Sequence, residues 1–230
     1  MSEYDPEHFD QLLKEQASKY GSITLPPEYA ELFEVNTLQL LVKLARYKFV
    51  ARQLKKTDHV LEIGSGNGIG TMFLSQHARQ ATGIEIEASS HEAAVKINRR
   101  PNVEFLLQSV FNHDLSHKYD AIVSFDVIEH LTAEDGAILV DRMAQHCKPN
   151  GMVVIGTPSI YSYPYQSAYS RASHIKCYDQ QELVALFDEH FGRSLAFSMN
   201  DEMVHTGFSK LAWYYFVLGF GPKSTAAKKA

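Results

Sequence analysis

The sequence predicts an α/β fold built on a doubly wound parallel sheet. Strand and helix patterns alternate from about residue 55 to Ala144, as such a sheet requires. The hydrophobic positions Val60, Leu61 and Ile63 indicate a strand buried on both faces. A glycine-rich turn follows directly, and a helical pattern then runs from Gly70 to Gln76. This succession of strand, turn and helix is the second observation that predicts the fold class.

The glycine-rich turn and the strand after it predict a binding crevice for adenosine. Glycines alternate at Gly64, Gly66 and Gly68, and a turn without Cβ atoms lets backbone N–H groups approach a ligand closely. About twenty residues later, the strand pattern 81–86 contains Glu85, whose carboxylate can accept both hydroxyls of a ribose. The dinucleotide fingerprint G-x-G-x-x-G would need glycine where this chain has Ile69, so a different adenosine cofactor is indicated.

The stretch from Glu62 to Gly68, with the pattern E-x-G-x-G-x-G, resembles motif I of the class I S-adenosylmethionine (SAM)-dependent methyltransferases. The resemblance extends over about residues 45–160. The segments 102–110, 119–131 and 148–158 are similar to that family's third strand, its fourth strand with motif IV, and its fifth strand. Two positions depart from the common pattern: Ser109 stands where the family usually has Asp, and Asn150 interrupts the usual K-P-G-G turn.

The resemblance implies a Rossmann-like seven-stranded sheet that ends in an antiparallel hairpin, with strands at 193–199 and 212–218. It also implies SAM as cofactor. Glu62 would serve the methionine end, Ile86 would pack on the adenine face, and Ser109 with the Val110 N–H would reach the adenine edge. Arg46 would either meet the methionine carboxylate or lie on a solvated helix face. The residues expected to bind the cofactor are Glu62, Gly64, Ser65, Gly66, Glu85, Ile86, Ser109, Val110 and Asp126.

The whole chain is expected to form a single methyltransferase domain with four parts. Residues 1–54 would be a helical N-terminal lid, with helices at 6–20 and 28–54, the second in one or two pieces. Its apolar stripe would be Leu40, Leu41, Leu44, Tyr47 and Phe49. Residues 55–160 would be the SAM-binding core, and 161–218 the acceptor side with the last strands. Asp179 and Glu182 predict a capping box for a helix to about Glu189, and 219–230 would be a flexible basic tail.

Two interpretations of the chemistry stay open. His130 follows the fourth strand at the carboxyl edge where ligands of such sheets bind, which makes it the candidate general base. Alternatively, Asp126, Glu129 and His130 form a D-x-x-E-H pattern, and His174 follows later. Some relatives, including small-RNA 2′-O-methyltransferases and ubiquinone-pathway O-methyltransferases, hold a divalent ion with E-x-x-E-H and a later His. Here the shorter Asp126 replaces the first Glu, while D-V-I-E-H-L is also common in metal-free relatives.

The methyl acceptor is expected to bind near a tyrosine-rich loop after the fifth strand. Tyr161, Tyr163, Tyr165 and Tyr169 would line a pocket for a ring or a sugar face, and His174, His205 and Asn200 would face the same pocket. O-methylation of a small molecule or sugar is the leading prediction. The alternatives are a metal-dependent RNA 2′-O-methyltransferase, an N-methyltransferase, and a non-catalytic SAM-binding protein, which the intact glycine motif, Glu85 and His130 disfavour.

Composition limits the partners of this chain. Its 230 residues fit one α/β domain, and 45% of them are hydrophobic. The net charge of −5 gives no general attraction to nucleic acid. The two cysteines lack metal-type spacing, the first residues do not resemble a signal peptide, and the apolar run 211–220 is too short to span a bilayer. The expected location is therefore the cytoplasm.

Overall fold

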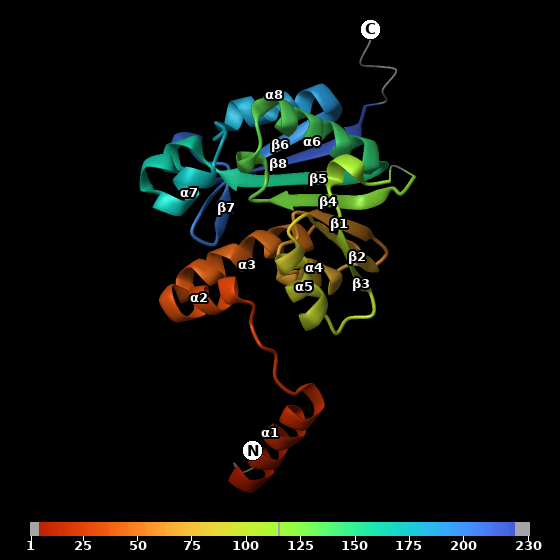
Figure 1. The fold of residues 1–230 in the computed structure, drawn as a ribbon, viewed down its shortest axis with the longest axis vertical. Helices are drawn as coiled ribbons and strands as arrows, with labels where there is room; N and C mark the ends of the chain where they lie inside the picture. The colour runs from red at the N-terminus through yellow and green to blue at the C-terminus, as the bar shows by residue number, and fades with distance from the viewer. Residues whose placement is uncertain (1–4, 115, 224–230) are drawn as a thin grey trace.

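The structure, a computed structural model, describes residues 5–114 and 116–223. Eight strands form one mixed sheet within these residues, in the order β3-β2-β1-β4-β5-β8-β6-β7 (Figure 1). The strands are β1 (His59–Ile63), β2 (Gln80–Glu85), β3 (Val103–Leu107), β4 (Tyr119–Phe125), β5 (Cys147–Pro158), β6 (Phe191–Asn200), β7 (Met203–His205) and β8 (Tyr214–Pro222). The helices are α1 (Pro6–Tyr20), α2 (Pro27–Val35), α3 (Thr37–Ala51), α4 (Ile69–Ser75), α5 (Ala88–Ile97), α6 (Ala133–His146), α7 (Ala168–Ser173) and α8 (Gln180–His190). The predicted α/β class and doubly wound arrangement are confirmed.

Helices cover both faces of the sheet, and each face has its own hydrophobic core. Figure 1 shows α6 and α8 on one face and α3, α4 and α5 on the other. Leu139 of α6 and Phe187 of α8 pack with Leu61 and Ile122 of the central strands, whereas Val50 and Leu74 pack on the opposite face. All of these side chains are fully buried. The central strands read as continuous hydrophobic runs because both of their faces are covered.

The C-terminal part of the sheet is antiparallel, as predicted, but it contains more strand than expected. β8 lies between β5 and β6 and runs antiparallel to both. The three-residue strand β7 extends the edge beyond β6, so the sheet has one more strand than the seven predicted. β8 also continues to Pro222, where Gly219–Pro222 had been assigned to a flexible tail. Met152 of β5 pairs with Phe220 there, which supplies the ladder that orders these residues. The remainder of the predicted tail, 224–230, lies outside the described residues.

The predicted N-terminal helices all form, but only α2 and α3 pack on the domain. None of the residues of α1 is buried, and Figure 1 shows α1 extending away from the sheet. The long helical pattern divides at Asn36, whose side chain accepts a hydrogen bond from the Gln39 N–H and caps α3. Tyr47 is buried in the expected stripe, whereas Leu41 is half exposed. Asp179 caps α8 through the Glu182 N–H, as predicted.

Candidate functional site

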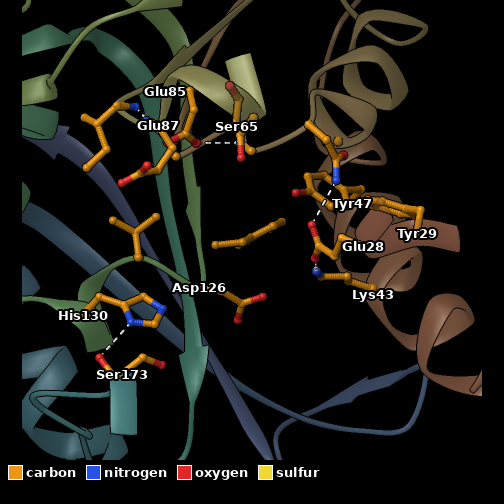
Figure 2. A pocket seen from close by; sticks show the side chains of 18 of the residues that line it. Glu28, Tyr29, Lys43, Tyr47, Ser65, Glu85, Glu87, Asp126, His130 and Ser173 are labelled. Carbon is orange, nitrogen blue, oxygen red and sulfur yellow. Dashed lines mark hydrogen bonds and ion pairs between the residues drawn. The ribbon is translucent and has the colours of Figure 1, made fainter. Parts of the chain in front are cut away.

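A cavity of about 510 Å³ lies at the carboxyl ends of the parallel strands. Open α/β sheets bind ligands at this edge, where neighbouring strands connect in opposite directions. The glycine-rich loop after β1, the end of β2 and the end of β4 form one side, and α2, α3 and α7 form the other. Figure 2 shows the labelled side chains around this space, with Tyr29, Lys43 and Tyr47 facing Glu85 and His130 across it.

The glycines of the loop are required by its geometry. Gly64 has φ of 72°, and a Cβ there would come within 2.3 Å of Val127 Cγ2. Gly66 has φ of 50°, and a Cβ there would meet nothing within 4 Å. Gly66 lines the cavity, so a side chain at this position would occupy ligand space. A residue with a side chain would also be strained in the left-handed backbone conformation that the loop has here. The loop is therefore a cradle that keeps the cavity open for a closely approaching ligand.

Glu85 ends β2 with its carboxylate at the cavity, as the sequence predicted. Its two oxygens accept the N–H groups of Gly66 (2.7 Å), Ile86 (2.8 Å) and Glu87 (2.9 Å) (Figure 2). An ionised carboxylate has about four acceptor sites, so capacity for a ligand hydroxyl remains. These backbone bonds fix the carboxylate against the glycine loop, where a ribose bound in the cavity would meet it.

A smaller cavity of about 90 Å³ adjoins the first and contains the predicted adenine residues. Ile86, Ser109 and Val110 line it, and the Ile86 side chain is 67% exposed. The Ser109 hydroxyl accepts the Phe111 N–H and caps the short 3₁₀ turn at 110–112. Its own O–H stays available to donate to a ligand. The apolar slot and its polar edge suit a flat heteroaromatic ring.

Glu62, which the resemblance implies serves the methionine end, does not line either of these cavities. Its side chain is 1% exposed and accepts a hydrogen bond from the Thr71 hydroxyl, while its second oxygen has no hydrogen-bond partner. Burial is the main reason why its pKa rises to about 7. Tyr47 and Gly70 line the cavity instead. Glu62 therefore supports the loop from below.

Asp126 lines the cavity at the end of β4, and Arg46 of α3 binds it. The Arg46 Nη1 atom lies 2.5 Å from Asp126 Oδ2. The guanidinium group also stacks over the Tyr214 ring, with its Cζ atom 3.8 Å from the ring centroid. Asp126 also has φ of 55°, which is rare for a residue with a side chain. Its second carboxylate oxygen is buried and has no hydrogen-bond partner. Arg46 is thus half of an ion pair rather than part of a solvated helix face.

His130 is held in one tautomer by the chain of α7. Its Nδ1 lies 3.0 Å from the Ser173 carbonyl oxygen (Figure 2). A carbonyl can only accept, so Nδ1 carries a proton, and in the neutral imidazole the lone pair is then on Nε2. The His130 side chain is exposed and lines the cavity. The ring of His174 lies 5.0 Å away in a T-shaped arrangement.

Three of the four predicted metal ligands come together. Glu129, His130 and His174 each offer a ligand atom within 4.8 Å of the others. The Glu129 carboxylate is buried, with one oxygen bonded to Thr157 and the other without a partner, and burial followed by the Asp126 charge raises its pKa. Asp126 lies outside this group because its carboxylate pairs with Arg46. The structure thus groups three of the four candidate ligands and leaves out Asp126.

The sequence did not indicate how α2 reaches the site. Glu28 accepts the Asn67 side-chain amide at 2.9 Å and also binds Lys43 of α3 (Figure 2). Glu28, Tyr29 and Lys43 all line the cavity. An asparagine inside the glycine loop was the only local signal, since its amide needs a partner when buried. Which acid supplies that partner depends on the packing of α2, which local sequence does not specify.

The tyrosine-rich loop divides between two cavities. Tyr169 lines the first cavity, and Tyr165 lines a second cavity of about 500 Å³ between α3, α7 and β8. Tyr161 and Tyr163 line neither of the two. His174 lines the second cavity, whereas the predicted pocket residues His205 and Asn200 do not. Asn200 instead accepts the Trp213 N–H through its side chain at 3.0 Å, which orients the segment before β8.

Comparison with known proteins agrees with this geometry. The sequence model of a family described as "Methyltransferase domain" matches residues 37–192. This chain therefore belongs to the class I SAM-dependent methyltransferases. A curated relative named ubiquinone biosynthesis O-methyltransferase, from Rickettsia akari (strain Hartford), is 32% identical over 136 residues, which cover 56% of this chain and 52% of that protein. A relative of the same name from Bradyrhizobium diazoefficiens is 26% identical over 137 residues. The chain thus spans about half the length of these relatives.

Solved structures show the same fold at low identity. A possible histamine N-methyltransferase from Thermotoga maritima is 16% identical, with 84% of this chain and 94% of that chain covered and a TM-score of 0.66. The N-methyltransferase NodS from Bradyrhizobium japonicum WM9, solved with S-adenosyl-l-homocysteine (SAH), is 17% identical, with coverage of 83% and 88% and a TM-score of 0.58. Among the described residues, no helix combines the length and the hydrophobicity needed to cross a membrane.

Proposed function

We propose that this protein transfers the methyl group of SAM to a hydroxyl oxygen of a small molecule or sugar. The observation that carries the proposal is the His130–Ser173 hydrogen bond, because it leaves a basic ring nitrogen at the edge of the cofactor cavity. The curated relatives from Rickettsia akari and Bradyrhizobium diazoefficiens are named O-methyltransferases, which favours oxygen over nitrogen as the acceptor atom.

The residues at the cavity suit the adenosine part of SAM. Ile86 and the Ser109–Val110 edge would hold adenine in the smaller cavity, and Glu85 would accept the ribose hydroxyls. The open space at Gly66 leaves room for a bound cofactor to approach the backbone of the loop closely. When bound, SAM supplies an electrophilic methyl group on a sulfonium and a thioether leaving group.

The protein's own contribution is alignment and proton removal. His130 Nε2 would take the proton of the acceptor hydroxyl as the new O–CH₃ bond forms. The Ser173 carbonyl would stabilise the imidazolium that results, because Nδ1–H remains pointed at it.

Cofactor binding is tested by titration calorimetry with SAH. Glu85→Ala should weaken SAH binding by about 10- to 100-fold, the range for losing hydrogen bonds to a charged group. Glu104→Ala, an exposed acid on the neighbouring strand β3, is the matched control and should bind as wild type. Melting curves of both variants check the fold, since Glu85 also holds three backbone N–H groups. Equal SAH affinity in folded Glu85→Ala would refute the ribose assignment.

The role of His130 is tested by turnover. His130→Ala should lower kcat by about 10²- to 10⁴-fold while SAH affinity stays unchanged. A metal-assisted reaction is the second candidate, because Glu129, His130 and His174 gather within 4.8 Å and Glu129 has an unpartnered oxygen. These three ligands would suit a divalent ion with an open position. If His130 acts as a simple base, activity survives strong chelation and His174→Ala leaves kcat within a few-fold of wild type.

Metal analysis of the purified protein separates the two candidates independently of activity. Metal-assisted transfer predicts a stoichiometric Mg, Mn or Zn content that His174→Ala removes, together with loss of activity on chelation and recovery on adding the ion. A metal-free, chelation-resistant enzyme would eliminate this candidate. Full activity of His130→Ala would contradict both.

A further inference from the structure

The second cavity is separate from the cofactor site but lies directly beside it. The two cavities lie on opposite sides of the Arg46–Asp126 ion pair: Asp126 lines the first and Arg46 the second. The two histidines divide in the same way, with His130 on the first cavity and His174 on the second, and their ring centroids are 5.0 Å apart. A molecule that contacts His174 in the second cavity would therefore lie next to the ring of His130, the proposed base.

The walls of the second cavity offer many uncharged hydrogen-bonding groups. Three side-chain amides and three hydroxyls line it, and they bond to one another in the pairs Asn36–Gln39, Ser162–Gln166 and Ser167–Ser170. Moreover, Gln166 Oε1, His174 Nδ1 and Arg46 Nε are buried and have no hydrogen-bond partner. Buried polar atoms are almost always satisfied in folded proteins. Unpartnered atoms on one wall indicate that a ligand with several hydroxyls completes them.

The same cavity has an aromatic platform at its rim. The rings of Tyr165 and Trp213 lie 5.6 Å apart, and their side chains are 74% and 52% exposed. Both line the cavity. Large exposed aromatic side chains beside polar groups provide an apolar surface that can pack against the C–H face of a pyranose ring.

Charge excludes an anionic ligand from this place. Arg46 is the one cation among the residues that line the second cavity, and its charge is already balanced by Asp126. Asp201, an exposed acid, also lines the cavity. A carboxylate or phosphate would therefore find no free positive partner.

We propose that the second cavity binds a neutral saccharide and presents one of its hydroxyls to the cofactor cavity for methylation. A phenol has one or two hydrogen-bonding groups, too few for the three unpartnered atoms Gln166 Oε1, His174 Nδ1 and Arg46 Nε, whereas a pyranose has several hydroxyls and an apolar face. The cavity of about 500 Å³ lies within the usual range of roughly 300–1,000 Å³ for small-ligand sites. This inference rests on the proposed methyl transfer and names its acceptor class.

The chain provides its own probe, because Trp213 is its one tryptophan. Tryptophan fluorescence is recorded on the full chain saturated with SAH while methyl glycosides of glucose, galactose and mannose, N-acetylglucosamine and the disaccharides maltose and cellobiose are titrated. At least one saccharide should give a saturable change, and catechol and benzoate should give none. Tyr165→Ala and Gln166→Ala should weaken that binding at least about tenfold, a loss of about 1.4 kcal/mol. Tyr163→Ala, a change in the same loop that lines neither cavity, should bind as wild type.

Three results would overturn the inference. Catechol binding without any saccharide binding would assign the cavity to phenols, and silence of Trp213 with the whole panel would remove the saccharide class. Wild-type affinity in both folded Tyr165→Ala and Gln166→Ala would place the saccharide elsewhere. The titration uses SAH and measures no turnover. A failure of saccharide binding can therefore be distinguished from a failure of the proposed methyl transfer. A saccharide that binds here but receives no methyl group would contradict methyl transfer to this acceptor, not the binding site.

Discussion

Glu62 combines a supporting position with an unusual protonation equilibrium. Its carboxyl group lies beneath the glycine loop, bonded to Thr71 and 1% exposed. Burial raises its pKa from 4.5 to about 7, because desolvation disfavours the charged form and the Glu85 charge adds to this. The hydrogen bond from Thr71 opposes the shift but does not cancel it. The loop therefore rests on an acid that changes charge close to neutral pH.

This equilibrium predicts a pH-dependent stability. Between about pH 4.5 and pH 7, Glu62 is protonated in the folded protein but ionised in the unfolded chain. The free energy of unfolding therefore falls as the pH rises through this window. Glu62→Gln cannot ionise and removes this dependence. As the pH rises from about 5 to about 8, the free energy of unfolding of the variant should increase relative to that of wild type by up to about 3 kcal/mol. Urea unfolding at both pH values measures the difference.

The control for this prediction is Glu104→Gln, which removes an exposed acid from β3. It should show the same pH dependence of the unfolding free energy as wild type. A Glu62→Gln variant whose stability falls with pH in parallel with wild type would show that Glu62 is already ionised in the folded protein, and the assignment of a raised pKa would be wrong.

At the scale of elements, α2 is the part of the N-terminal region that closes the cofactor cavity. Glu28 connects it to the loop residue Asn67 and to Lys43 of α3. α1 has no buried residue, and the segment after it is held by Arg99, which donates to the Tyr20 and Ser22 carbonyls at 2.9 Å and 2.7 Å. The lid predicted from the sequence over 1–54 therefore separates into α1, which lines neither cavity, and α2–α3, which line them.

Two truncations test this division. Deletion of residues 1–20 removes no residue that lines the cofactor cavity, so SAH affinity should stay within about twofold of wild type. Deletion of residues 1–35 removes Glu28 and Tyr29 and exposes the cavity, so SAH should bind at least about tenfold more weakly. Calorimetry gives the affinities, and circular dichroism verifies folding. Wild-type affinity and methylation after the longer deletion would show that α2 is no lid.

The order of elements was predictable from the sequence because it depends on local patterns. The helix 6–20, the glycine turn and the capped helix after Asp179 all carry signals within a few residues of their ends. The three-residue strand β7 was missed, since so short a run has no periodicity of its own. The end of β8 was placed too early because residues 219–222 were assigned to a basic terminal tail, whereas pairing with β5 and β6 orders them.

The site was predictable only where a motif fixes both residue and place. The cofactor cavity is lined, as expected, by Glu85, Gly66 and His130. Each of them lies at or shortly after the carboxyl end of a parallel strand. Arg46 and Asp126 are 80 residues apart, and no local pattern predicts that they pair. The second cavity likewise draws its walls from α3, α7 and β8, so its shape is a property of tertiary packing.

At the scale of the whole molecule, the distribution of charge disfavours binding of nucleic acid. The chain has 27 acidic and 22 basic residues, and the cofactor cavity is lined by Lys43 together with four acids: Glu28, Glu85, Glu87 and Asp126. Near the acceptor side, Lys176 is paired with Glu182 at 2.5 Å, and Arg171 donates to the Gln166 carbonyl oxygen. RNA binding draws its strength from cations that neutralise phosphates, and the cations at this site already have partners.

We therefore expect no measurable affinity for a structured RNA at physiological salt, and no transfer of labelled methyl groups from SAM to it. Both cavities also suit a molecule of small-ligand size rather than a folded strand, whose recognition requires a basic surface and stacked bases. Fluorescence anisotropy with a labelled stem-loop, repeated at low salt, measures the binding. Weak binding that appears only at low salt is the general attraction of any surface lysine for phosphate and agrees with this expectation. Tight binding that weakens steeply with added salt, or methylation of the RNA, would overturn the small-molecule assignment and favour the RNA 2′-O-methyltransferase alternative.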